Sequence, residues 1–170
     1  VIIYGATLGD ERMVDLSTSG AHIVGGSMDD KIGTIMAGGG DLDGDGQHDI
    51  LIGAPNNEEG GVASYPLPWV AGKAYAVLGS SLSEGSTLNL ATDSDYAFIG
   101  KRHLVMGDWS ATRLGSAVDF AGDIDGDGLD DILLGANAAV GQRKGGAYIF
   151  LSANLDGSAA MNIDDRDVVI

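Results

Sequence analysis

A segment of fifteen residues occurs twice in this chain, and the repetition constrains the fold more than any other feature. DLDGDGQHDILIGAP occupies 41–55, and DIDGDGLDDILLGAN occupies 123–137, a shift of 82 residues. Apolar runs at 1–4, 75–78 and 148–151 recur at shifts of 74 and 73. Self-similarity at a fixed period is typical of repeat architectures, in which each unit covers the apolar face of its neighbour.

Each repeat is predicted to contain four short strands and no long helix. The candidate segments are rich in Val, Ile, Tyr and Leu and are bounded by Gly, Asn, Asp and Ser. We expect strands at 33–39, 49–54, 73–79 and 95–99, at 115–121, 131–136, 145–151 and 166–170, and at 1–5 and 21–25 in an N-terminal half repeat. Residues 50–52 and 132–134 are apolar at consecutive positions, which predicts strands buried on both faces.

Four-stranded units of this length, buried on both faces, are typical of propeller blades packed between neighbours. We therefore predict an all-β fold, a β-propeller segment of about two and a half four-stranded antiparallel blades. The half blade spans 1–25, the first full blade 26–100 and the second 101–170. Because two and a half blades cannot close a ring, we expect the chain to be part of a larger propeller, or to associate so that its end blades are covered.

The repeated segment carries the pattern Asp-x-Asp-x-Asp-Gly-x-x-Asp between the first and second strands of each repeat. Alternate residues of a tight loop point the same way, so the carboxylates at positions one, three and five are expected to converge. The carbonyl at position seven and the carboxylate at position nine would complete the shell. The predicted ligands are Asp41, Asp43, Asp45, Gln47 and Asp49 in the first loop, and Asp123, Asp125, Asp127, Leu129 and Asp131 in the second. This hard oxygen shell predicts two Ca²⁺ sites rather than zinc or copper. Because the loops lie in different blades, we expect the loss of one site by Asp45→Ala and of the other by Asp127→Ala to be roughly additive.

Two alternatives to this interpretation are an acidic turn without an ion and an EF-hand. Glycine and aspartate are common in turns. Two copies in the same register, with four carboxylates that would repel one another without a cation, favour a metal site. An EF-hand needs a glutamate at position 12 and flanking helices. Position 12 is Ile52 or Leu134, inside a predicted strand, so the EF-hand interpretation fails.

The acidic loop followed by Gly53-Ala54-Pro55 resembles the FG-GAP repeat of integrin α-subunit β-propellers and their bacterial relatives. The second repeat has Gly135-Ala136-Asn137 at that place, and aliphatic residues replace the phenylalanine of FG at 32 and 114. The resemblance covers 32–170 as two full repeats, with half a repeat before them. It implies a seven-bladed propeller, Ca²⁺ in hairpin loops of the blades and a role in extracellular adhesion.

Two connections, 56–72 and 101–113, are longer than their counterparts, and we interpret both as inserted surface loops. Because strands alternate in direction, both are expected side by side at the end opposite the acidic loops. They carry the predicted ligand-binding residues, which are Tyr65, Trp69, Arg102, His103 and Trp109. The alternative is that the two tryptophans only pack against their own loops.

The net charge and the composition exclude several classes of function. The net charge of −16 argues against binding to nucleic acid or to an anionic membrane, and suits cations. No apolar run reaches the ~18 residues that a membrane-spanning helix needs. The three histidines form no recognisable catalytic arrangement, so no enzymatic activity is expected.

These features together predict a calcium-binding module for adhesion or ligand binding, located outside the cell or at its surface. Its partner would be a protein or a glycan bound at the end that carries the two insertions. One alternative is a non-catalytic accessory region of a secreted enzyme, such as a phospholipase or a carbohydrate-active enzyme. Another is a purely structural role in which calcium is the only ligand.

Overall fold

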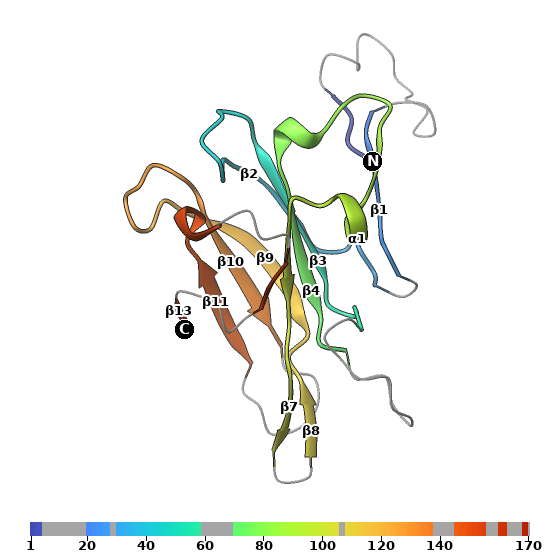
Figure 1. The fold of residues 1–170 in the computed structure, drawn as a ribbon, viewed down its shortest axis with the longest axis vertical. Coiled ribbons are helices and arrows are strands. Elements are labelled where there is room, and N and C mark those ends of the chain that lie inside the picture. The colour runs from blue at the N-terminus through green and yellow to red at the C-terminus, as the bar shows by residue number, and fades with distance from the viewer. Residues whose placement is uncertain are drawn as a thin grey trace.

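The computed structural model describes residues 1–4, 20–27, 30–58, 70–105, 108–137, 145–155, 160–162 and 168–169. This part of the chain is mostly β-strand with little helix (Figure 1). The strands are β1 (His22–Val24), β2 (Met36–Gly40), β3 (Asp49–Ala54), β4 (Lys73–Val77), β5 (Thr87–Asn89), β6 (Tyr96–Ile99), β7 (Arg102–Val105), β8 (Asp108–Ala111), β9 (Leu114–Gly122), β10 (Asp131–Ala136), β11 (Gly146–Phe150), β12 (Ala160–Asn162) and β13 (Val168–Val169). The helical elements are α1 (Leu90–Asp93) and the short 3₁₀ helices η2 (Gly79–Ser81) and η3 (Ser152–Asn154). No helix in these ranges is both long and apolar enough to cross a membrane.

Two antiparallel sheets correspond to the two full repeats. In the first sheet, β2, β3, β4 and β6 lie side by side in chain order, and in the second sheet β9, β10, β11 and β13 do the same. The strands β3 and β10 have the predicted bounds, 49–54 and 131–136. The all-β prediction with four-stranded antiparallel units is confirmed.

Consecutive side chains of the first sheet enter two different cores, as the apolar runs predict. Leu51 belongs to a core shared by the two sheets, whereas Ile52, the next residue, belongs to a core on the opposite face. In the shared core the rings of Phe98 and Phe150 are 4.8 Å apart between centroids. The second core also contains Leu88 from β5. The strand β3 is therefore buried on both faces.

Two short strands that the sequence pattern did not predict link successive units by parallel pairing. The strand β5, between the third and fourth strands of the first sheet, pairs with β1, so that Ile23 faces Leu88. The strand β12, at the same place in the second repeat, pairs with β6, so that Phe98 faces Met161. Each unit therefore reaches the last strand of the unit before it.

Three sequence predictions need correction. Among residues 1–4 the predicted strand at 1–5 is reduced to one antiparallel bridge between Ile2 and Ala21, because no other described segment pairs with it. The first strand of the first sheet begins at Met36 rather than at 33, since a turn precedes it, with φ of +83° at Gly33. The insertion 101–113 is not a loop, since most of it forms the hairpin β7–β8.

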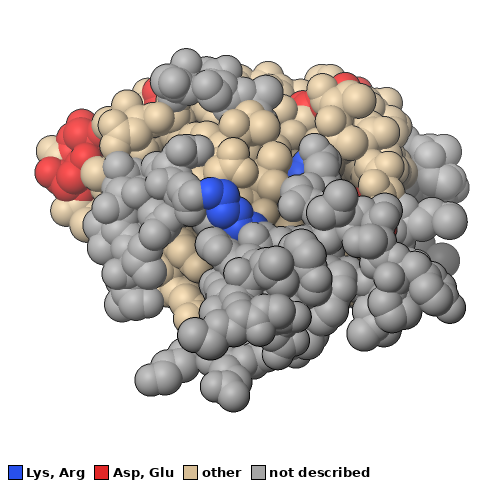
Figure 2. Space-filling view, turned by 60° about the horizontal axis from the view of Figure 1, so that its bottom comes forward, with Lys and Arg blue, Asp and Glu red and all other residues tan. Residues whose placement is uncertain are grey.

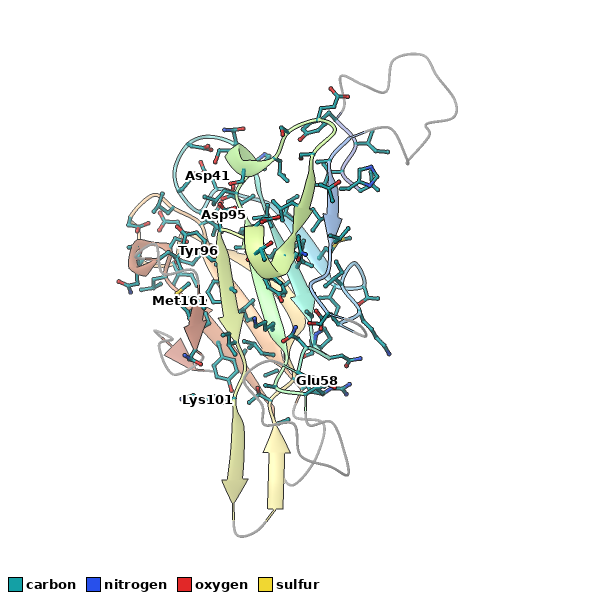
Figure 3. The ribbon with its side chains drawn as sticks, turned by 45° about the vertical axis from the view of Figure 1, so that its right-hand side comes forward. Asp41, Glu58, Asp95, Tyr96, Lys101 and Met161 are labelled. Carbon is teal, nitrogen blue, oxygen red and sulfur yellow. The ribbon has the colours of Figure 1, made fainter. Side chains whose placement is uncertain are left out.

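The strand directions place the acidic loops and the hairpin at opposite ends of the molecule. Figure 1 shows the β2–β3 and β9–β10 loops toward the upper end and β7–β8 at the lower end. In Figure 3, Asp41 lies at the end opposite Lys101 and Glu58, which belong to the two insertions. The two-ended arrangement expected from strand alternation is therefore present.

Candidate metal centre

The first acidic loop, 41–49, is a tight turn that its own first aspartate closes. Asp41 accepts backbone hydrogen bonds from Gly44 at 2.8 Å and from Gly46 at 3.0 Å, one on each carboxylate oxygen. Asp43 accepts a third from the amide of Asp45 at 3.1 Å. Both glycines have φ near +80°, at +75° and +82°, a conformation that favours residues without a β-carbon. The turn therefore needs glycine at position four as well as at position six.

The second acidic loop, 123–131, repeats this turn. Asp123 accepts hydrogen bonds from Gly126 at 2.6 Å and from Gly128 at 3.0 Å. Asp125 accepts one from the amide of Asp127 at 3.1 Å. The φ angles of the two glycines are +84° and +94°. The same residue pattern thus produces the same backbone geometry in both repeats.

Three carboxylate oxygens converge in each loop, and in each case they lie within 4.8 Å of one another. They belong to Asp41, Asp43 and Asp45 in the first loop and to Asp123, Asp125 and Asp131 in the second. An all-carboxylate set fits a hard divalent cation, which prefers oxygen ligands. Like charges at this spacing repel, and a bound cation would relieve that repulsion. Both loops could therefore hold a metal ion.

The residues at position seven, which were predicted to offer carbonyl ligands, hold the carboxylate at position five through their amides. Gln47 donates its backbone amide to Asp45 at 2.7 Å and its side-chain amide to the other oxygen of Asp45 at 2.8 Å. Leu129 donates its backbone amide to Asp127 at 2.8 Å. The carbonyl-ligand role of Gln47 and Leu129 stays a prediction.

The closing aspartate of the first loop connects the loop to the sheet. The side chain of Asp49 is 1% exposed, and its two oxygens accept hydrogen bonds from the amides of Leu42 at 2.6 Å and Gly79 at 2.8 Å. Burial raises the pKa of Asp49 above its usual value; the two amides oppose this shift, and the charges of Asp43 and Asp41 add to it. A cation bound beside these carboxylates would favour the ionised form.

The closing aspartate of the second loop has the same two connections. Asp131 is fully buried and accepts hydrogen bonds from the amides of Ile124 and Ser152, each at 2.9 Å. The hydroxyl group of Ser152 also donates to the carbonyl of Asp130. Position nine thus has a structural role that the sequence pattern alone did not indicate, in addition to its predicted role as a ligand.

The two acidic loops touch each other. The amide of Asp41 donates to a carboxylate oxygen of Asp130 at 2.9 Å, and the amide of Asp130 donates to the carbonyl of Asp41 at 2.9 Å. A β-carbon on Gly44 would lie 3.0 Å from the side chain of Leu129. This contact argues against the expected independence of the loops, because residues within one hydrogen-bond network couple.

Asp130 was not among the predicted site residues, because its partner lies in the other repeat and no pattern within one repeat indicates the contact. The corresponding residue of the first loop is His48, which is exposed.

Figure 2 shows acidic side chains gathered at one edge of the molecule, on the side where Figure 1 places the β9–β10 loop.

A model of the FG-GAP repeat matches residues 33–65 and 114–150. This chain contains two FG-GAP repeats. Each match includes the first and second strands of one sheet with the acidic loop between them, which is consistent with the repeats of integrin α-like propellers. No curated protein sequence matches this chain.

The other end of the FG-GAP blades carries the predicted ligand-binding residues. Tyr65 and Trp69 lie outside the described residues. Arg102 and His103 lie on β7 and Trp109 lies on β8, where Leu104 faces Trp109 in the antiparallel register. The structure describes the backbone of this hairpin, so whether these five side chains form one surface stays a prediction.

The ends of the two insertions lie side by side. Arg113 donates a guanidinium hydrogen bond to the side-chain carbonyl of Asn56 at 2.7 Å. The hydroxyl group of Thr112 donates to the carbonyl of Ala71 at 2.9 Å and accepts from the amide of Lys101 at 3.0 Å. The bases of the two insertions are therefore tied together across the two blades.

Proposed function

We propose that this chain is a calcium-binding, integrin-like module for adhesion or ligand binding, acting outside the cell or at its surface. The observation that carries the proposal is a carboxylate triad in each of the two acidic loops, which occupy equivalent places in two FG-GAP repeats. The net charge of −16 supports a role with cations and opposes one with nucleic acid.

Calcium is the proposed ion because of the ligand chemistry and the loop geometry. The donors are carboxylates, and Ca²⁺ accepts six to eight oxygen ligands in flexible geometry. Mg²⁺ requires a tighter octahedral shell and loses its water reluctantly. The role of the ion would be structural, because both loops are tied to their sheets by Asp49 and Asp131.

We place the partner-binding surface at the opposite end, on the insertions 56–72 and 101–113. The joined bases of these insertions support this choice, because segments held on a rigid scaffold are common sites of recognition. A protein or a glycan is the proposed partner, and the module itself is proposed to be non-catalytic. The rest of a propeller, or a second copy of the chain, would cover the end blades.

Calorimetric titration of the chelator-treated chain with CaCl₂ tests the metal assignment. Two bound ions are expected for the unaltered chain, and one each for Asp45→Ala and Asp127→Ala. Asp119→Ala serves as the matched control, because Asp119 is an exposed aspartate of β9 outside both loops. Two ions bound by either loop variant would contradict the assignment, and so would the loss of an ion in the control.

A further inference from the structure

We propose that Asp130, which lies outside the predicted ligand set, is a positioning residue for the first metal loop and couples the two loops. Calcium bound in the second loop would then raise the affinity of the first. This inference rests on the proposed function, because it assumes that both loops bind Ca²⁺.

The contact holds the backbone at the start of the first loop. Both polar backbone groups of Asp41 are engaged by one residue, since Asp130 accepts from its amide and donates to its carbonyl, each at 2.9 Å. The carboxylate of Asp41 belongs to the first triad and closes the turn through Gly44 and Gly46. The position of Asp130 therefore determines where the first ligand of the first loop stands.

Asp130 is in turn held by the second loop. It precedes Asp131, whose carboxylate belongs to the second triad and is fixed by the amides of Ile124 and Ser152. The carbonyl of Asp130 also accepts from the hydroxyl group of Ser152. An ion that orders the second loop would thus order Asp130, and the first loop would lose less conformational freedom when its own ion binds.

Charge and geometry both act through this contact. The carboxylate of Asp130 adds a negative charge at the backbone amide of Asp41, a residue of the first triad, and a negative charge attracts a cation. Repulsion between two bound cations acts in the opposite direction, but salt screens charges at exposed loops. We expect the ordering effect to exceed the repulsion, with an increase in affinity on the order of fivefold, at the low end of typical couplings between sites.

Calcium titrations of the whole chain test the coupling, with the dissociation constant of the first loop as the readout. Asp127→Ala, which removes the predicted position-five ligand of the second loop, should weaken binding at the first loop about fivefold. Asp130→Ala should weaken it by a similar factor, and adding Asp127→Ala to that variant should have little further effect. Asp130→Asn keeps an acceptor oxygen and should restore part of the affinity. His48→Ala, at the same position of the first loop, should leave both constants unchanged.

An NMR titration separates a positioning role from a general loss of stability. In Asp45→Ala the first loop lacks a ligand, so Ca²⁺ fills only the second loop, and the amide signal of Asp41 should still shift. Asp130→Ala in the same background should abolish that shift. If Asp130→Ala does not fold, Asp130→Asn and the Asp41 signal in Asp45→Ala carry the test.

The outcomes distinguish the two proposals. The coupling would be overturned if Asp127→Ala and Asp130→Ala each change the dissociation constant of the first loop by less than twofold and the Asp41 amide signal does not shift. If the unaltered chain still binds two ions, calcium binding itself would stand. An unaltered chain that binds no Ca²⁺ would overturn both.

Discussion

Leu42 and Ile124 occupy the same position of the two acidic loops, yet Leu42 is 2% exposed and Ile124 is 53% exposed. Leu42 belongs to the core shared by the two blades, so the second blade covers it. Nothing among the described residues covers Ile124 in the same way. The free face of the second blade thus presents an apolar residue that a neighbouring blade covers in the first.

The burial of Leu42 predicts a large difference between two matched variants. Leu42→Ala should lower the free energy of unfolding by about 2–4 kcal/mol, because it leaves a cavity between the blades. Ile124→Ala should change it by no more than about 0.5 kcal/mol, as exposed positions usually do. Urea denaturation in excess Ca²⁺ measures both. Equal losses would show that the two blades do not pack as described.

The first glycine of the Gly-Ala-Pro element predicts a difference in stability between two matched glycine variants. A β-carbon on Gly53, the first residue of the GAP element, would lie 2.2 Å from the carbonyl oxygen of Gly115 in the next blade. Gly53→Ala should therefore push the blades apart and cost about 1–3 kcal/mol. Gly135→Ala is the control, since its nearest atom is the β-carbon of Ala117 at 3.0 Å. A control that loses as much stability as Gly53→Ala would contradict this account of the motif.

The buried aspartate of the first loop predicts a loss of stability that does not depend on metal. Asp49→Ala leaves the amides of Leu42 and Gly79 without their acceptor, and each buried unpaired group costs about 1–3 kcal/mol. Urea unfolding in EDTA should therefore show a loss of roughly 2–4 kcal/mol. Asp43→Ala, at an exposed position of the same loop, should have a small effect, because it also removes repulsion within the triad. A comparable loss in Asp43→Ala would argue against the buried connection.

The proposed ligand surface predicts that the two tryptophans matter for binding and not for metal. Trp69→Ala or Trp109→Ala should weaken binding to a glycan selected on an array by roughly 1–3 kcal/mol if these side chains are anchors. The Ca²⁺ affinity should stay unchanged. If the tryptophans only pack their own segments, stability should fall instead. Full glycan binding by a folded double variant would place the site elsewhere.

The repeated segments allowed the fold and the acidic loops to be predicted from the sequence. The strand at 49–54 is apolar at consecutive positions because its neighbouring side chains are buried in two different cores. The same spacing of Asp and Gly produces the same turn in both loops. These features depend on local residue patterns, which recur whenever the local structure recurs.

Features that depend on contacts between repeats could not be predicted in this way. The strands β5 and β12 are three residues long and pair with a different unit, so no local periodicity indicates them. The contact between Asp41 and Asp130 joins residues 89 positions apart. The hairpin β7–β8 was missed because comparison of repeats shows an added segment but not its structure.

Thermal unfolding of one sample in EDTA, in excess CaCl₂ and in excess MgCl₂ tests most directly whether calcium binds both loops and stabilises the blades. An ion at a hundred times its dissociation constant stabilises the native state by about 2.7 kcal/mol per site. With two sites, the midpoint of unfolding should rise on the order of 10 °C in CaCl₂. It should rise less in MgCl₂, because Mg²⁺ gives up its water shell reluctantly. Unfolding curves that coincide in EDTA and in CaCl₂ would contradict the account.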